Sequence, residues 1–184
     1  CESGADAIVM GAGLPLDLPE MTAEFPDVAL IPILSDARGV GVVLKKWLRK
    51  QRLPDAIVIE HPKYAGGHLG ANRIEDLGDA RFEFDRVMDE VSALLRELGI
   101  ASERLPLIAA GGVNTHDKVR ALLGMGYAGV QLGTAFAVTE EGDAHPRYPA
   151  SLLVEHDGDE PAVEERDAGQ GAGAEREHRP EIAP

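Results

Sequence analysis

The sequence is poor in cysteine, in basic residues and in long hydrophobic runs, and each shortage excludes a class of protein. Its single cysteine, Cys1, cannot form an internal disulfide, which favours a reducing cytoplasm. The 18 Lys and Arg against 32 Asp and Glu give a net charge of −14, so we expect neither a nucleic-acid nor an anionic-membrane partner. No apolar run approaches the roughly 20 residues that span a bilayer.

Five short apolar runs of Ala, Val, Ile and Leu predict the strands of a parallel sheet: 7–10, 29–34, 56–59, 107–110 and 129–132. Each run is nearly continuous, which is typical of strands buried on both faces. Apolar residues recur at helical spacing between them, over 40–48, 87–98 and 119–123. Strands that alternate with helices predict an α/β fold.

Two architectures fit this inventory of strands and helices. A complete eightfold (β/α)8 TIM barrel takes about 250 residues, or roughly 31 for each βα unit, so five units need about 155. The pattern therefore predicts part of a barrel, about strands 4 to 8. It also fits a complete open sheet of five strands, and the motifs must decide between the two.

The composition changes after residue 146. Residues 147–184 carry ten acidic and four basic side chains, with repeated Gly and Ala and few large aliphatic residues. Such a segment buries too little apolar area to offset the entropy lost on ordering. We therefore predict a barrel part over 1–146 and an acidic, disordered tail over 147–184.

Glycine follows the fourth and the fifth predicted strands. Gly111 and Gly112 end "LPLIAAGG", and Gly133 with Thr134 ends "AGVQLGT". The carboxyl ends of parallel strands face the active site, and glycine there lets backbone N–H groups approach a phosphate. Either motif alone is typical of a tight turn. Together, one helix apart, they predict a shared phosphate site, which barrels commonly place after strands seven and eight.

His68 follows the third predicted strand in "EHPKYAGGHLG" (60–70), where three glycines leave space around its side chain. A histidine placed there is suited to proton transfer near neutral pH. A solvated histidine in a flexible loop is the alternative. A metal site of Glu60, His61 and His68 is a further alternative. Adjacent residues of a strand point to opposite sides, however, so we predict no metal.

Six motifs in order resemble the nitronate monooxygenase family: "ADAIVMGAGLP", "IPILSDARGV", "KKW", "LPDAIVIEHPKYAGGHLG", "PLIAAGGV" and "GVQLGTAF". The resemblance covers about residues 1–146. It implies an FMN-dependent TIM barrel that oxidises alkyl nitronates or nitroalkanes with dioxygen to carbonyl compounds and nitrite. The strands present are similar to the family's fourth to eighth, so the resemblance also implies that the first three lie outside this sequence.

The resemblance assigns roles to particular residues. His68 falls on the catalytic histidine, which acts as base toward a neutral nitroalkane. The residues that the resemblance places at FMN are Gly11, Gly67, Gly111, Gly112, Gly133 and Thr134. The chain departs from the family at His61, where many relatives carry glycine.

Two rival functions follow from the same motifs. An FMN-dependent enoyl-acyl carrier protein reductase shares the glycine-flanked histidine and the FMN phosphate site. The other rival is a non-catalytic remnant, because five of eight barrel units leave two unpaired sheet edges. A flavin spectrum distinguishes the remnant from both enzymes.

Overall fold

The computed structural model describes residues 1–11, 13–65, 71, 73–137, 139 and 141. Its five strands are β1 (Ala7–Met10), β2 (Ala29–Leu34), β3 (Ile57–Glu60), β4 (Leu107–Ala110) and β5 (Gly129–Gln131). Its α-helices are α1 (Leu18–Met21), α2 (Ala37–Leu48), α3 (Phe84–Glu97), α4 (His116–Gly124) and α5 (Thr134–Ala137). Short 3₁₀ helices are η1 (Pro62–Tyr64), η2 (Ile74–Gly78), η3 (Ala80–Phe82) and η4 (Ser102–Arg104). The predicted tail, 147–184, lies outside the described residues.

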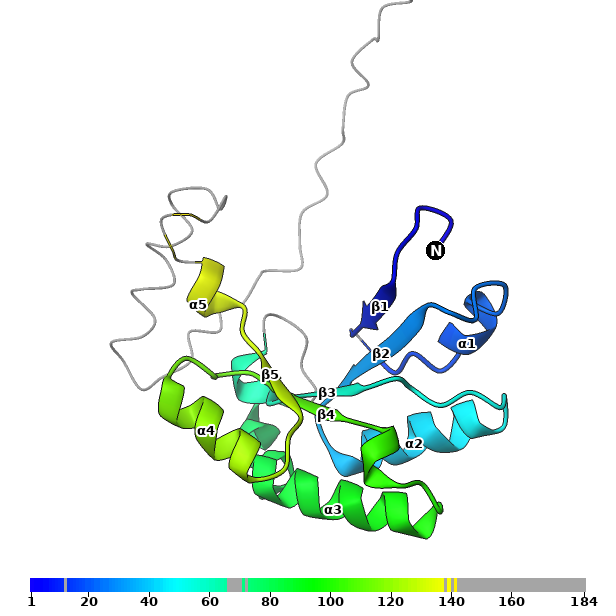
Figure 1. Cartoon of the computed structure of the whole chain (residues 1–184). Helices are drawn as coiled ribbons and strands as arrows, with labels where there is room; N and C mark the ends of the chain where they lie inside the picture. Colours follow the sequence, from blue (N-terminus) through cyan, green and yellow to red (C-terminus); the bar gives the residue numbers. More distant parts are fainter. Residues whose placement is uncertain (12, 66–70, 72, 138, 140, 142–184) are drawn as a thin grey trace, which may run out of the picture.

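The strands form one parallel sheet in the order β1-β2-β3-β4-β5, the same as their order along the chain. A doubly wound open sheet reverses its strand order at a switch point and places helices on both faces. Here the order never reverses, and α2, α3 and α4 cover the same face (Figure 1). The sheet is therefore part of a TIM barrel, as the sequence predicts, and not a complete open sheet.

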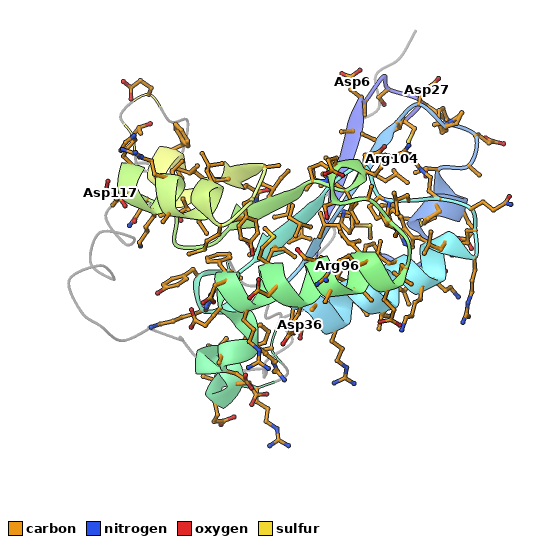
Figure 2. All side chains as sticks on the ribbon, turned by 60° about the horizontal axis from the view of Figure 1, so that its bottom comes forward. Asp6, Asp27, Asp36, Arg96, Arg104 and Asp117 are labelled. Atoms are coloured by element: carbon orange, nitrogen blue, oxygen red, sulfur yellow. The ribbon has the colours of Figure 1, made fainter. Side chains whose placement is uncertain are left out.

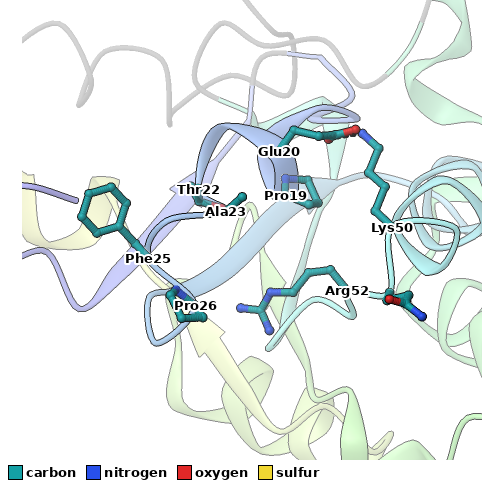
Figure 3. A pocket seen from close by; sticks show the side chains of 9 residues that line it. Pro19, Glu20, Thr22, Ala23, Phe25, Pro26, Lys50 and Arg52 are labelled. Atoms are coloured by element: carbon teal, nitrogen blue, oxygen red, sulfur yellow. Dashed lines mark hydrogen bonds and ion pairs between the residues drawn. The ribbon is translucent and has the colours of Figure 1, made fainter.

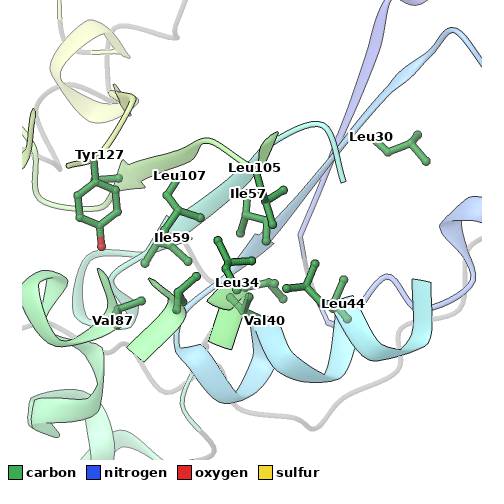
Figure 4. Packing of buried hydrophobic residues seen from close by; sticks show 14 of the residues in the cluster. Leu30, Leu34, Val40, Leu44, Ile57, Ile59, Val87, Leu105, Leu107 and Tyr127 are labelled. Atoms are coloured by element: carbon green, nitrogen blue, oxygen red, sulfur yellow. The ribbon is translucent and has the colours of Figure 1, made fainter. Parts of the chain in front are cut away.

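The main core lies between the sheet and helices α2 and α3 (Figure 4). Leu34 and Ile59 of the strands meet Val40 and Leu44 of α2, and all four are at most 5% exposed. Trp47 is fully buried, and its Nε1 donates to the carbonyl of Pro15 at 3.0 Å. Burial of this kind stabilises the fold by roughly 1.5–3 kcal/mol for each large apolar side chain.

Burial of both strand faces was predicted for all five strands, and for β1, β2 and β5 this prediction is wrong. In β5, Gly129 and Val130 are half-buried and Gln131 is exposed. In β2, buried Leu30 and Leu34 alternate with half-buried Ile31 and Ile33. In β1, which is an edge strand, Val9 remains 53% exposed. In the described part of the chain no helix covers the second face of these strands, which in a barrel packs on the strands opposite.

The turn that follows α2 contains a residue in the left-handed backbone region. Gln51 has φ +56°, and the turn is closed by the N–H of Arg52, which donates to the carbonyl of Trp47 at 3.1 Å. A Cβ in this region costs about 1–2 kcal/mol, and glycine avoids that cost.

We therefore expect Gln51→Gly to raise the free energy of unfolding by about 0.5–1 kcal/mol, after the greater entropy of glycine in the unfolded chain is subtracted. Urea unfolding would show a higher midpoint with an unchanged slope. Gln51→Ala is the control, because alanine keeps the Cβ and should bring no gain. A glycine variant no more stable than the alanine variant would contradict the assignment of strain.

Two aspartates and a surface hollow lie at the amino-terminal ends of the strands. Asp6 and Asp27, which precede β1 and β2, lie together at this end, far from Asp117 of α4 (Figure 2). Lys50 donates to the carbonyl of Leu16 at 2.7 Å and pairs with Glu20 beside the hollow (Figure 3). The remaining lining includes the segments before β2 and β3, so the hollow is at the opposite edge from the predicted site.

Candidate FMN-phosphate corner

The predicted site residues within the described part of the chain all come shortly after strand ends: Gly11, Gly111, Gly112, Gly133 and Thr134. Because the strands are parallel, these residues share the carboxyl edge of the sheet. The last rung between β4 and β5 pairs Ala110 with Gln131, so the turns after these strands begin side by side. Gly11 follows the far edge strand, with β2 and β3 between. His68 and Gly67 lie outside the described residues, and their roles stay predictions.

Gly111 and Gly112 form a corner in which backbone angle and close packing both favour glycine. Their φ angles are +93° and +67°. A Cβ on Gly111 would lie 3.0 Å from the carbonyl oxygen of His61, and a Cβ on Gly112 would lie 2.8 Å from Cδ2 of Tyr64. The corner is therefore packed against His61 and η1, the start of the segment that leads toward His68.

The same corner offers donors that suit a phosphate. The backbone N–H groups of Gly112 and Val113 have no hydrogen-bond acceptor among the described residues. Adjacent backbone N–H groups that lack a protein acceptor are what phosphate oxygens bind. The residues present at 111–113 therefore fit the phosphate of FMN.

Gly133 differs from this corner. Its backbone is not left-handed, and no described atom lies within 4 Å of a Cβ built on it. Packing among the described residues does not require glycine at 133. Its role in phosphate binding, with that of Thr134, stays a prediction.

His61 fixes the position of η1 beside the corner. Its side chain is 7% exposed, and its Nδ1 accepts the N–H of Lys63 at 3.3 Å. The ring packs against Tyr64 and Phe84, with ring centroids 5.3 and 5.8 Å away. Burial lowers the pKa of His61; the charge of Glu83 opposes this shift, and that of Lys63 adds to it.

The burial of His61 predicts that the protein loses stability in acid. With its pKa lowered in the folded state, His61 binds a proton more readily in the unfolded chain, so stability falls as pH drops below about 6.5 and stops falling below the folded pKa. We expect His61→Gln, whose amide oxygen can still accept from Lys63, to lose stability less steeply over this range. Thermal unfolding at a series of pH values tests this, and equal slopes in the two proteins would contradict it.

Sequence reasoning missed two residues that build the corner. Tyr64 packs on Gly112, and nothing in its sequence context indicates this contact. Lys118 lies in the first turn of α4, where a cation opposes the helix dipole. A lysine at that position indicates that its amine has a specific partner, and the amine does donate to the carbonyl of Gly112 at 2.9 Å.

A parallel sheet in sequential order, with α2, α3 and α4 on one face, defines part of a TIM barrel, and the glycine corner lies at its carboxyl edge. The family model for nitronate monooxygenase matches residues 1–174. The chain belongs to the nitronate monooxygenase family. The match continues past residue 146, and the boundary predicted there stays a prediction.

Individual relatives agree with this assignment. The chain is 31% identical over 119 residues to a probable nitronate monooxygenase of Bacillus subtilis, a match that covers 65% of this chain and 31% of that protein. It is 38% identical over 98 residues to a nitronate monooxygenase of Pseudomonas aeruginosa, covering 53% and 25%. The chain thus spans less than a third of the length of these relatives.

Solved structures support the fold. The structure of FabK from Thermotoga maritima superposes with a TM-score of 0.60 at 24% identity, over 83% of this chain and 40% of that one. Among the described residues, no helix is long and apolar enough to cross a membrane.

Proposed function

We propose that this chain supplies the phosphate-binding corner and the catalytic base of an FMN enzyme that oxidises alkyl nitronates or nitroalkanes with dioxygen. The products are a carbonyl compound and nitrite. The observation that carries the proposal is the contact of the Gly111-Gly112 corner with His61 and Tyr64. This contact anchors the start of the segment that bears His68 beside the predicted phosphate site.

In this proposal the glycine corner binds the cofactor and His68 transfers the proton. The N–H groups of Gly112 and Val113 would hold the phosphate oxygens of FMN, and Gly11, Gly67, Gly133 and Thr134 would be the other residues that contact the cofactor. When bound, FMN supplies the electron-accepting chemistry. His68 takes the α-proton of a neutral nitroalkane, which suits an imidazole near neutral pH. A preformed nitronate has already lost that proton and does not need the base.

Nitrite release tests the reaction. Protein incubated with FMN in air should convert an alkyl nitronate to nitrite in step with oxygen consumption. Consumption of NAD(P)H driven by an enoyl thioester, without nitrite, would instead identify an enoyl reductase. Folded protein that binds no flavin would identify a non-catalytic remnant. Because a single cysteine cannot form an internal disulfide, the cytoplasm is the compartment that we expect for this protein.

A further inference from the structure

Lys118 holds the carbonyl side of the phosphate corner. Its Nζ donates to the carbonyl oxygen of Gly112 at 2.9 Å and to Oδ1 of Asn114 at 3.2 Å. It makes these bonds from the first turn of α4, whose N-cap is Thr115. The side chain thus reaches back from the helix to the glycine corner, against the preference of the helix dipole.

A fixed carbonyl also fixes the next N–H group. No cis peptide bond occurs among the described residues, and in a trans peptide the C=O and N–H bonds point in opposite directions. A lysine that holds the carbonyl of Gly112 therefore turns the N–H of Val113 to the other side of the peptide. Because Gly112 lacks a Cβ, it resists a flip of this peptide weakly. The flipped peptide would present an oxygen atom where an anion needs a donor.

We infer that Lys118 is a positioning residue for the phosphate corner, acting through the orientation of the Gly112–Val113 peptide. This inference rests on the proposed function, because the anion in question is the phosphate of FMN. Lys118 does not itself bind the phosphate. Its loss lets the peptide populate the flipped state, and the apparent affinity for a phosphate falls in proportion to the donor-presenting fraction.

Flavin affinities measured with and without the phosphate test the inference. Lys118→Met should weaken FMN binding about tenfold, as expected if the donor-presenting state falls to roughly a tenth, and leave riboflavin binding unchanged. Lys118→Arg should restore most of the FMN affinity, because guanidinium can also donate to the carbonyl. Lys45→Met is the matched control: it removes the same charge from an exposed position on α2 and should alter neither affinity.

Salt separates positioning from direct attraction. At about 0.5 M salt exposed charges are largely screened, so a direct effect of the Lys118 charge should vanish while a positioning effect persists. Three results for Lys118→Met would overturn the inference: equal losses of affinity for FMN and riboflavin, no loss for either, or a loss that disappears in salt. In each case, FMN binding by the unmodified chain would still support the proposed function. An unmodified chain that does not prefer FMN to riboflavin would overturn the phosphate corner itself, and the inference with it.

Discussion

Replacing Gly111 with alanine should lower the free energy of unfolding by about 3 kcal/mol. A side chain at φ +93° costs about 1–2 kcal/mol, and overpacking adds roughly 1–3 kcal/mol. The new Cβ would meet the backbone oxygen and nitrogen of His61 at 3.0 and 3.1 Å. Neither atom can rotate away, because the N–H of His61 is bonded to the carbonyl of Ala110. Chemical denaturation measures the loss, and FMN affinity should fall with the distorted corner.

Two comparisons show whether the loss comes from this contact. Gly112→Ala should cost less, about 2 kcal/mol, because it meets the ring of Tyr64, which is 53% exposed and can swing outward. Gly133→Ala should change stability by less than about 0.5 kcal/mol, because its Cβ enters open space. A Gly111→Ala protein as stable as the Gly133→Ala protein would show that the corner is not packed as described.

Replacing His68 with asparagine should depress kcat/KM for neutral nitroalkanes by about 10²–10⁴-fold, the usual contribution of a general base. Asparagine keeps a similar size and a hydrogen-bonding group but cannot accept the α-proton at neutral pH. Preformed nitronates should react at nearly the same rate, since they need no base. Steady-state kinetics with both forms of one substrate measure the difference.

His116→Asn is the matched control for this substitution. His116 lies at the start of α4 with a side chain 80% exposed, so its replacement should affect neither substrate. Equal and mild effects of His68→Asn on both forms of the substrate would remove the base from the mechanism. The proposal for the phosphate corner would stand apart from that result.

The strands were predictable because each is a short, nearly continuous run of apolar residues between segments with helical spacing. Three of the five observed ranges, β1, β2 and β4, coincide with the predicted runs. Apolar periodicity does not give the order of strands in a sheet, so the prediction of a partial barrel depended on the sequence motifs.

The contacts that build the corner were not predictable. They join residues about 50 positions apart, such as His61 with Gly111, and apolar periodicity carries no information about such pairs. The exposure of Val9 was missed for a related reason. An apolar strand looks the same in sequence whether its second face is covered or open, and here the described elements leave it open.

Visible absorption is the most direct test of the claim that the Gly111-Gly112 corner belongs to an FMN site. The purified chain is incubated with FMN, freed of unbound flavin by gel filtration, and checked for native secondary structure by circular dichroism. The account predicts a yellow protein that retains equimolar FMN, with flavin bands shifted from those of free FMN. A folded protein that emerges colourless would contradict it.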